Sequence, residues 1–314
     1  MLQERPLISI VVPIYNEEEC LPETLSRLLA VQLSLSARAD CEFIFVDDGS
    51  KDRSLTLLKN AAAVRTEIKV ISFSRNFGHQ IAITAGIDAA KGNYVAVIDG
   101  DLQDPPELIN PMFELANTGY DVVYGKRRRR AGETWFKKVT ATAFYRLFSF
   151  MCAIELPADT GDFRIMSRRV VDAFKQMRER HRFVRGMIPW VGFSAIPFQY
   201  DRDKRYAGKT KYPFYKMVAF AINAILSFSI KPLTLAIKVG LITILVGFAG
   251  GIYMLYLKLF TDIPVAGVTA ILLCNIIFSG IQLVLIGVQG EYVARIFEEV
   301  KNRPLYLITE TLNI

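Results

Sequence analysis

Cysteine is scarce in this chain, with four residues among 314, and none stands close to another. This spacing supplies neither a metal-ligand set nor a redox pair, so we expect reduced thiols that serve packing in cytoplasm or bilayer. The four positions are Cys20, Cys41, Cys152 and Cys274. A basic segment followed by an apolar leader is also missing at the N-terminus, so we expect the first domain to remain cytoplasmic.

Two common nucleotide-binding signatures are missing as well. The sequence has neither the G-x-G-x-x-G loop of dinucleotide-binding sheets after its first strand nor a G-x-x-x-x-G-K-S/T Walker loop. The turn after the first apolar run, Asn16-Glu17-Glu18-Glu19, is acidic instead of glycine-rich. A phosphate bound there needs a bridging metal ion in place of a cradle of backbone amides.

Hydrophobic residues, by contrast, are abundant. They make up 52% of the chain, and the mean hydropathy of +0.27 is high for a wholly soluble protein. We therefore expect part of the chain to lie in lipid. The net charge of +7 fits an anionic surface or substrate, a class that includes nucleic acid, membrane headgroups and sugar nucleotides.

Apolar runs of strand character alternate with helical patterns through the first hundred residues. The runs are 7–15, 43–46, 68–73 and 94–98. This alternation predicts an α/β fold with a mainly parallel, Rossmann-like sheet and helices on both faces. Ligands of such sheets bind beyond the carboxyl ends of the strands. Polar residues follow each run, namely Tyr15, Glu17, Asp47, Asp48, Arg75, Asn76, Asp99, Asp101 and Gln103.

The run from Tyr94 to Ile98 ends abruptly in carboxylates. Asp99 and Asp101, two residues apart beyond a buried strand, can both face one divalent cation. Hard oxygen ligands suit Mg²⁺ or Mn²⁺, which usually complete their coordination with water and substrate phosphates. The pattern therefore favours a metal-bound diphosphate. Two solvated aspartates that cap the next helix are the alternative.

Four ordered motifs carry a family resemblance. They are Val11-Val12-Pro13-Ile14-Tyr15-Asn16-Glu17, Val46-Asp47-Asp48-Gly49-Ser50-Lys51-Asp52, Ser74-Arg75-Asn76-Phe77-Gly78 and Asp99-Gly100-Asp101-Leu102-Gln103-Asp104-Pro105. The chain resembles the GT-A-fold glycosyltransferases of family 2. The last two motifs together resemble the polyisoprenyl-phosphate glycosyltransferases, which include dolichol-phosphate mannose synthases and bactoprenol glucosyl transferases.

The resemblance implies a donor site. Its nucleotide-binding residues would be Pro13, Tyr15, Glu17, Asp47 and Asp99. Asp99, Asp101 and Gln103 would hold Mg²⁺ or Mn²⁺ at the diphosphate, and catalysis would depend on Asp99, Asp101 and Arg164. For Asp47, a helix cap after a strand remains the alternative. His79, at the start of a predicted helix, receives no role.

The resemblance also implies an acceptor site for a lipid phosphate. Arg164 lies in a segment like the family's acceptor-phosphate segment, and Arg205 and Lys211 match basic positions of a mobile, membrane-proximal loop. Asp159 and Asp162 are further candidates that contact sugar hydroxyls or orient Arg164. The run Arg127-Arg128-Arg129-Arg130 is either a solvated face or a contact to lipid phosphate or headgroups, which makes Arg127 and Arg128 candidates as well.

Composition divides the chain into four parts. We expect a cytoplasmic GT-A domain over 1–211, juxtamembrane amphipathic helices over 212–238, two transmembrane helices over 239–257 and 264–290, and a cytoplasmic tail over 291–314. A buried helical hairpin is the alternative to the spans. Lys and Arg flank the hairpin, which predicts a multi-pass protein of the inner (plasma) membrane with both termini cytoplasmic.

Together with these features, the resemblance implies an inverting, metal-dependent polyprenyl-phosphate glycosyltransferase. It would transfer glucose from UDP-glucose to undecaprenyl phosphate at the cytoplasmic leaflet, giving a lipid-linked sugar donor for cell-surface glycan or protein modification. GDP-mannose or another nucleotide sugar is the alternative donor. A processive polysaccharide synthase lacks support because no Gln-x-x-Arg-Trp segment is present, and a non-catalytic membrane adaptor remains as a rival. We expect self-association as a dimer or tetramer, and no nucleic-acid partner.

Overall fold

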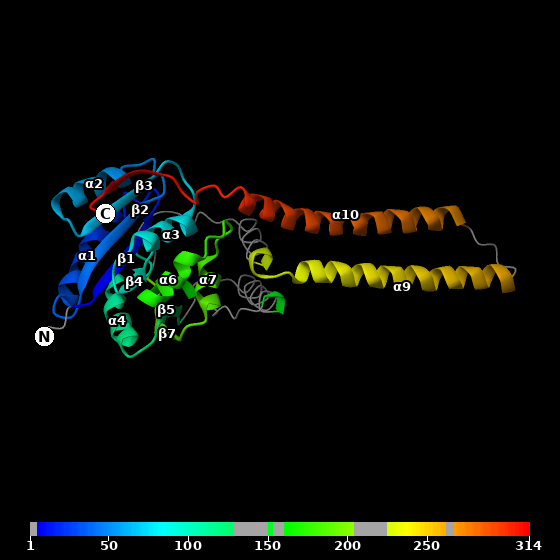
Figure 1. Ribbon diagram of the computed structural model, residues 1–314, viewed down its shortest axis with the longest axis horizontal. Helices are drawn as coiled ribbons and strands as arrows, with labels where there is room; N and C mark the ends of the chain where they lie inside the picture. Colours follow the sequence, from blue (N-terminus) through cyan, green and yellow to red (C-terminus); the bar gives the residue numbers. More distant parts are fainter. Residues whose placement is uncertain (1–4, 129–149, 153–159, 204–224, 262–266) are drawn as a thin grey trace.

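The protein is seen in a computed structural model that describes residues 5–128, 150–152, 160–203, 225–261 and 267–314. An α/β domain forms one end, and two long helices extend away from it (Figure 1). The strands are β1 (Leu7–Ile14), β2 (Asp40–Asp47), β3 (Ile68–Phe73), β4 (Tyr94–Val97), β5 (Val122–Arg127), β6 (Thr160–Ser167), β7 (Ala195–Tyr200) and β8 (Ile308–Leu312). The helices are α1 (Leu21–Leu35), α2 (Ser54–Val64), α3 (His79–Ala89), η1 (Pro106–Leu108), α4 (Ile109–Asn117), α6 (Arg168–Gln176), α7 (Val184–Val191), α9 (Lys231–Phe260) and α10 (Gly267–Val300).

The described strands form one sheet in the order β7-β5-β6-β4-β1-β2-β3-β8. β1 pairs in parallel with β2 and β4, β2 with β3, and β5 with β7. β6 is antiparallel to both β4 and β5, and β8 is antiparallel to β3. The predicted mainly parallel sheet is therefore confirmed. Because β6 is antiparallel to both of its neighbours, β4 and β5, these two point the same way. The carboxyl ends of β1 to β5 therefore lie at one edge of the sheet.

Two apolar layers cover the two faces of the sheet. On one face, Leu28 of α1, Leu58 of α2 and Phe113 of α4 belong to a fully buried core. On the other face, α3, α6 and α7 supply the core with Ile83, Phe174 and Met187, among others. β-strand alternation divides the sheet residues between the two cores, since successive side chains point to opposite faces. The domain is thus a three-layer sandwich with its strand tips open at one edge.

The two long helices carry almost uninterrupted apolar sequence. α9 and the stretch Cys274–Val300 of α10 are each long and apolar enough to cross a membrane, judged by length and composition, and neither is buried in the protein. Pro232 stands in the first turn of α9, a position that proline tolerates because no intrahelical donor is lost there. The predicted span 239–257 lies within α9, whereas 264–290 begins before α10 and ends ten residues short of Val300.

The segment after the long helices contains regular structure. The charge of residues 291–314 predicts a cytoplasmic tail, and within this segment α10 continues to Val300 and Ile308–Leu312 form β8. β8 pairs with β3 and ends beside α2, where the chain end is marked in Figure 1. The expected boundary of the catalytic domain at residue 211 therefore leaves out one strand of its own sheet. A five-residue strand with alternating polar residues carries too weak a local signal to be found without its partner.

Candidate active site

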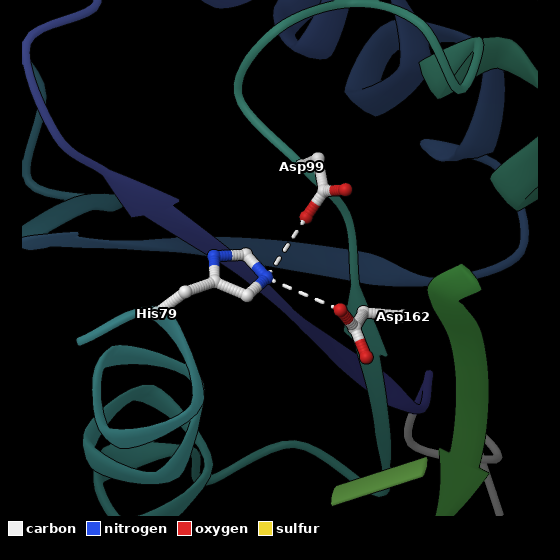
Figure 2. A group of neighbouring side chains, drawn as sticks. All are labelled: His79, Asp99 and Asp162. Atoms are coloured by element: carbon white, nitrogen blue, oxygen red, sulfur yellow. Dashed lines mark hydrogen bonds and ion pairs between the residues drawn. The ribbon is translucent and has the colours of Figure 1, made fainter. Parts of the chain in front are cut away.

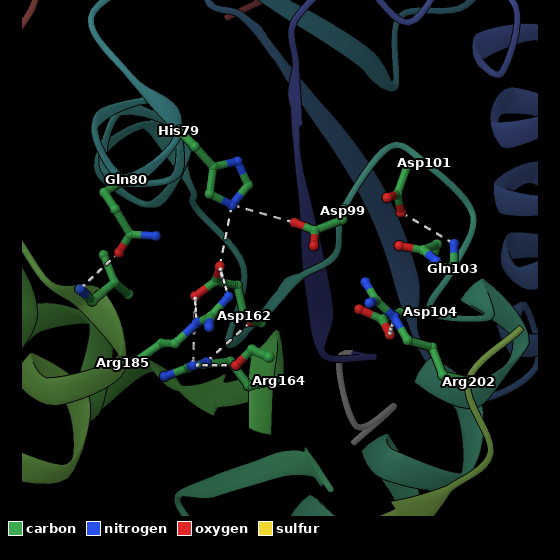
Figure 3. A network of polar contacts seen from close by, with 12 residues as sticks. His79, Gln80, Asp99, Asp101, Gln103, Asp104, Asp162, Arg164, Arg185 and Arg202 are labelled. Atoms are coloured by element: carbon green, nitrogen blue, oxygen red, sulfur yellow. Dashed lines mark hydrogen bonds and ion pairs between the residues drawn. The ribbon is translucent and has the colours of Figure 1, made fainter. Parts of the chain in front are cut away.

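The loop after β4 shapes the acidic centre of the strand-tip edge. Leu102 adopts a left-handed backbone conformation with φ of 58°, which turns the chain sharply. Asp101 Oδ1 accepts a hydrogen bond from the Gln103 backbone N–H at 3.1 Å. Asp101 and Gln103 are thus held together, while the Asp99 carboxylate, predicted to join them at a metal ion, points away from them toward α3 (Figure 3).

Asp99 instead joins a cluster with His79 and Asp162 (Figure 2). His79 Nε2 lies 3.4 Å from Asp99 Oδ1 and 3.2 Å from Asp162 Oδ2. Asp162 belongs to β6 and its side chain is 1% exposed, whereas His79, the first residue of α3, is 40% exposed. The sequence analysis assigns no role to His79. Its local context gave no sign of the contact, because both partners come from distant strands.

A buried carboxylate fixes the backbone that presents His79. Asp48, just beyond β2, accepts hydrogen bonds from the backbone N–H of Phe77 at 2.6 Å and of Gly78 at 3.0 Å. Gly78 has φ of 104°, a conformation that favours glycine. Asp48 therefore stabilises the turn before α3, and through it the position of the imidazole.

The cluster shifts the pKa values of its members. Burial disfavours the imidazolium of His79, but the hydrogen bond to Asp162 and the charge of Asp99 outweigh it and raise the His79 pKa to about 9. Burial is the main cause of the raised pKa of Asp99, which is about 6. The charge of His79 acts in the opposite direction and lowers that pKa. Arg185 and His79 together hold the pKa of Asp162 well below its ordinary value despite burial. At neutral pH the cluster therefore combines a charged imidazolium with ionised carboxylates.

Two arginines surround Asp162. Arg185 of α7 donates from Nε and Nη2 to the two carboxylate oxygens of Asp162, both at 2.9 Å, and its side chain is 36% exposed. Arg164 is only 4% exposed and donates to the backbone oxygens of Asp162 at 3.1 Å and Gly161 at 2.9 Å. Its burial lowers the Arg164 pKa to about 10. Arg164, predicted to bind the acceptor phosphate, thus lies inside the domain, and Arg185 is the more accessible cation.

Arg185 is a residue that the sequence analysis missed. It is the single charged residue of α7, whose sequence is Val-Arg-Gly-Met-Ile-Pro-Trp-Val. A lone cation in an apolar helix suggests a specific partner, because burying an unpaired charge is costly. That signal was present in the sequence, although it does not identify Asp162.

Asp104 anchors the other side of the crevice. It is completely buried and accepts a hydrogen bond from the Tyr200 hydroxyl at 2.5 Å and from Arg202 Nε at 3.2 Å. Arg127 Nη2 lies 3.8 Å from the same carboxylate, so this predicted candidate faces the site. Arg128 is exposed and donates its backbone N–H to Tyr200.

A pocket of about 600 Å³ opens beside the acidic centre, at the tips of β1, β2 and β3. Tyr15 and Asp47, two of the predicted nucleotide-binding residues, line it. Asp47 is buried and accepts hydrogen bonds from the Ser50 backbone N–H at 3.3 Å and the Ser72 hydroxyl at 3.2 Å. The remaining lining residues are Gly49, Ser50, Lys51, Leu55, Ser72, Phe73, Ser74, Arg75, Asn76, Thr309 and Glu310.

Other predicted residues stand apart from this pocket or outside the described part of the chain. Pro13 is buried within β1, opposite Val46, and Glu17 is half-buried in the turn after β1. Neither lines the pocket. Asp159, Arg205 and Lys211 lie outside the described residues.

The donor set of the crevice fits a divalent cation. Asp99 Oδ1 is buried and accepts no hydrogen bond from any residue that the structure describes. One ligand atom each from His79, Asp99 and Asp162 lie within 4.8 Å of one another. The set predicted from the sequence, Asp99 with Asp101 and Gln103, shares Asp99 with this cluster. Both sets offer oxygen ligands that suit Mg²⁺ or Mn²⁺.

Known proteins resemble most of this chain. Residues 9–174 match Glycosyl transferase family 2. The uncharacterized glycosyltransferase YkcC of Bacillus subtilis (strain 168) is 50% identical over 306 residues, covering 98% of this chain and 94% of that protein. The bactoprenol glucosyl transferase of Shigella phage SfII is 39% identical over 305 residues, covering 97% of this chain and 98% of that protein. The prophage bactoprenol glucosyl transferase homolog of Escherichia coli (strain K12) is 38% identical, covering 96% and 98%.

A solved structure is also similar, at a greater distance. The crystal structure of glucosyl-3-phosphoglycerate synthase from Mycobacterium tuberculosis, in complex with Mn²⁺, uridine-diphosphate and phosphoglyceric acid, matches 70% of this chain and 76% of its own. The two chains are 20% identical, and the TM-score is 0.47.

Proposed function

The chain belongs to glycosyl transferase family 2 and has its GT-A type fold, and from this premise we propose that it transfers a sugar from a nucleotide donor to a polyprenyl phosphate. UDP-glucose is the favoured donor and undecaprenyl phosphate the favoured acceptor. The observation that carries the proposal is one sheet edge that joins a pocket, an acidic centre and accessible Arg185. This is the order in which nucleoside, diphosphate and acceptor phosphate must lie. The names of the phage and prophage relatives support the lipid acceptor.

The nucleoside would occupy the pocket of Tyr15 and Asp47. A buried carboxylate such as Asp47 accepts a hydrogen bond from a base N–H, and Tyr15 offers an aromatic ring. The diphosphate would then reach the loop that carries Asp99, Asp101 and Gln103, where these residues would hold a divalent cation once the Asp99 carboxylate turns from His79 toward Asp101. When bound, such a cation supplies Lewis-acid stabilisation to the leaving diphosphate.

The acceptor phosphate would approach the cationic side of the crevice. Arg185 is exposed enough to meet it, and Arg164 adds a second positive charge behind Asp162. We keep Arg205 and Lys211 in this proposal on the basis of their sequence positions. Their task is to reduce the repulsion between two anions that must come together.

The reaction would be a direct displacement. An oxygen of the acceptor phosphate forms a bond to the anomeric carbon, while the bond from that carbon to the nucleoside diphosphate breaks and leaves its electron pair on the diphosphate. A phosphate monoester has a second pKa of about 6 and is largely ionised at neutral pH, so no strong general base is required. A single displacement inverts the configuration at the sugar carbon.

The long helices would bring the lipid to the domain. α9 and α10 suit a membrane hairpin, and basic residues such as Lys231, Arg295 and Arg303 flank it on the side of the catalytic domain. The positive-inside rule then orients the domain and both termini toward the cytoplasm. Two slender helices below a large domain also favour a dimer or tetramer in the membrane.

The experiment is sugar transfer in detergent. Purified protein would receive radiolabelled UDP-glucose, GDP-mannose or UDP-N-acetylglucosamine with undecaprenyl phosphate, with and without Mg²⁺ or Mn²⁺. We expect metal-dependent labelling of the lipid from UDP-glucose. Labelling from GDP-mannose alone would replace UDP-glucose as the assigned donor and leave the proposed reaction unchanged. If the protein is folded and binds nucleotide but labels the lipid from none of the donors, the proposed transferase activity is wrong. The non-catalytic membrane adaptor, which binds without turnover, would then remain.

A further inference from the structure

β8 reaches the catalytic sheet from beyond the long helices and is fixed there at both ends. Before the strand, Tyr306 stacks on Phe73 of β3 with ring centroids 5.1 Å apart and donates its hydroxyl to Asp88 at 3.0 Å. After the strand, the Asn313 amide donates to the backbone oxygens of Ala62 and Ile68, both at 2.9 Å. These contacts tie the segment to helices and strands on both sides of β3.

An irregularity in the pairing of β8 lies at the donor pocket. Ser72 of β3 pairs with Glu310, but the next residue, Phe73, pairs with Ile308. Thr309 is therefore an additional residue, a β-bulge. Bulges redirect side chains and occur often beside active sites. Here the bulged Thr309 lies between the partners of Phe73 and Ser72, and the Ser72 hydroxyl donates to Asp47; Thr309, Ser72 and Asp47 all line the pocket.

Glu310, which also lines the pocket, is held by an ion pair. Its carboxylate forms an ion pair with Lys59 of α2 at 2.5 Å, and both side chains are partly exposed. Glu310 and Thr309 line the pocket together with residues from the tips of β1, β2 and β3. The lining of the pocket therefore includes two residues of a strand that follows α10 in the chain.

We infer that β8 is part of the donor site and that Thr309 contacts the bound nucleoside. This inference rests on the proposed function, because it takes the pocket to hold the nucleoside of a sugar nucleotide. Thr309 contributes a surface that limits the space for the nucleoside, and Glu310 keeps that surface in place through Lys59. The segment after the membrane hairpin thereby takes part in donor recognition.

Cysteine protection tests the contact in the full-length protein. The exposed native thiol is first removed with Cys274→Ser, since the other three cysteines are buried. Thr309→Cys and Thr311→Cys are then made separately in that background. Both threonines are exposed and lie on the same strand, but Thr311 does not line the pocket. The measurement is the rate of maleimide labelling with Mg²⁺ alone, with Mg²⁺ and UDP, and with Mg²⁺ and GDP.

We expect saturating UDP to slow labelling of Thr309→Cys about tenfold or more and to leave Thr311→Cys within about twofold. A second pair of variants tests whether a larger side chain at position 309 reduces the space for the nucleoside. Thr309→Trp should weaken UDP binding, measured by calorimetry, about tenfold, while Thr311→Trp should bind as the wild type does. Equal labelling at both positions in protein that binds UDP or GDP would overturn the inference alone. Wild-type protein that binds neither nucleotide would overturn the proposed function and the inference with it.

Discussion

His79 Nε2 lies 3.2 Å from Asp162 Oδ2, although the two residues are 83 positions apart in the chain. The contact joins the first residue of α3 to β6 at the strand-tip edge of the sheet. Asp99 completes the cluster from the loop after β4, so side chains from two further segments converge on one imidazole (Figure 2). The predictions below test this edge and the domain that supports it.

The first prediction concerns Asp101. We expect Asp101→Asn to reduce sugar transfer about 100-fold or more, because an amide binds a divalent cation more weakly than a carboxylate. Asp172→Asn, on the exposed surface of α6, is the matched control and should keep wild-type turnover. Initial rates of lipid labelling give the answer. Near wild-type turnover of Asp101→Asn would remove this residue from the metal site.

A second prediction separates the two candidate ligand sets. Calorimetric titration with Mn²⁺ and UDP should show that Asp101→Asn weakens metal binding about tenfold more than His79→Gln does. The reason is that a charged imidazolium, favoured by the raised pKa of His79, has no free electron pair for a metal. The reverse order of effects would assign the metal to His79, Asp99 and Asp162.

The third prediction addresses the acceptor. Arg185→Gln should raise the KM for undecaprenyl phosphate about tenfold and change the KM for UDP-glucose by less than about twofold, because a charge-assisted contact to phosphate is lost. Arg38→Gln is the control, since Arg38 pairs with Glu114 and precedes β2, whose carboxyl end and not its start faces the crevice. An equal rise in both KM values for Arg185→Gln would show that this arginine serves the site as a whole instead of the acceptor.

The fourth prediction uses glycine geometry at the donor pocket. Gly49 has φ of 68°, and an added Cβ would lie 2.6 Å from the Arg75 carbonyl carbon and 2.8 Å from the Asn76 nitrogen. Gly49→Ala must therefore displace a wall of the pocket, and we expect UDP affinity to fall about tenfold. Gly119→Ala shares the positive φ without a close neighbour. That control should lose about 1 kcal/mol of stability without a change in UDP affinity.

The fifth prediction concerns a buried ion pair within the sheet. Lys69 Nζ lies 2.6 Å from Glu42 Oε2, and both side chains are largely buried. Breaking this pair with Lys69→Met should cost about 3 kcal/mol at pH 7, because it leaves a buried carboxylate without its cation. Thermal unfolding in detergent measures the loss. Lys91→Met, which alters an exposed side chain beside Glu42, should cost far less.

The pH dependence of that loss follows from Glu42. Burial opposes its ionised form, but hydrogen bonds from Lys69, Ser9 and the Lys91 backbone lower the Glu42 pKa below its ordinary value of 4.5. The pair therefore stabilises the fold fully above that value, and this contribution is lost as the pH falls through the lowered pKa. The difference between wild type and Lys69→Met should shrink as the pH is reduced from about 4.5 through the lowered pKa of Glu42. A constant difference would contradict the ionic origin of the effect.

Local sequence was a good guide to the regular half of the domain. The predicted strand over 68–73 matches β3, and the helix predicted to start at His79 is α3, whose first residue is His79. Apolar β-branched runs bounded by polar turns carry this information locally. The family resemblance, drawn from the same turns, is confirmed by the match to Glycosyl transferase family 2.

The missed features all depend on contacts between distant segments. Thr160–Ser167 includes Asp162 and Arg164 and does not look like a central strand, yet it inserts between β4 and β5. His79 and Arg185 both contact Asp162, and His79 also contacts Asp99, while Thr309 is recognised by its place at the irregularity between β3 and β8. Periodicity describes one segment at a time and cannot identify such partners. These are the positions at which the structure adds most to the interpretation of the site.

The position of β8 in the chain also orders events during biosynthesis. Synthesis produces β1 to β7 first, then both apolar helices, and only afterwards the strand that covers the open edge of β3. Until then β3 presents unpaired backbone groups, which are prone to mispairing with other strands. Closure of the sheet therefore comes after synthesis of both apolar helices. A chain in which Thr309 and Glu310 line the pocket is one whose two apolar helices have already been made.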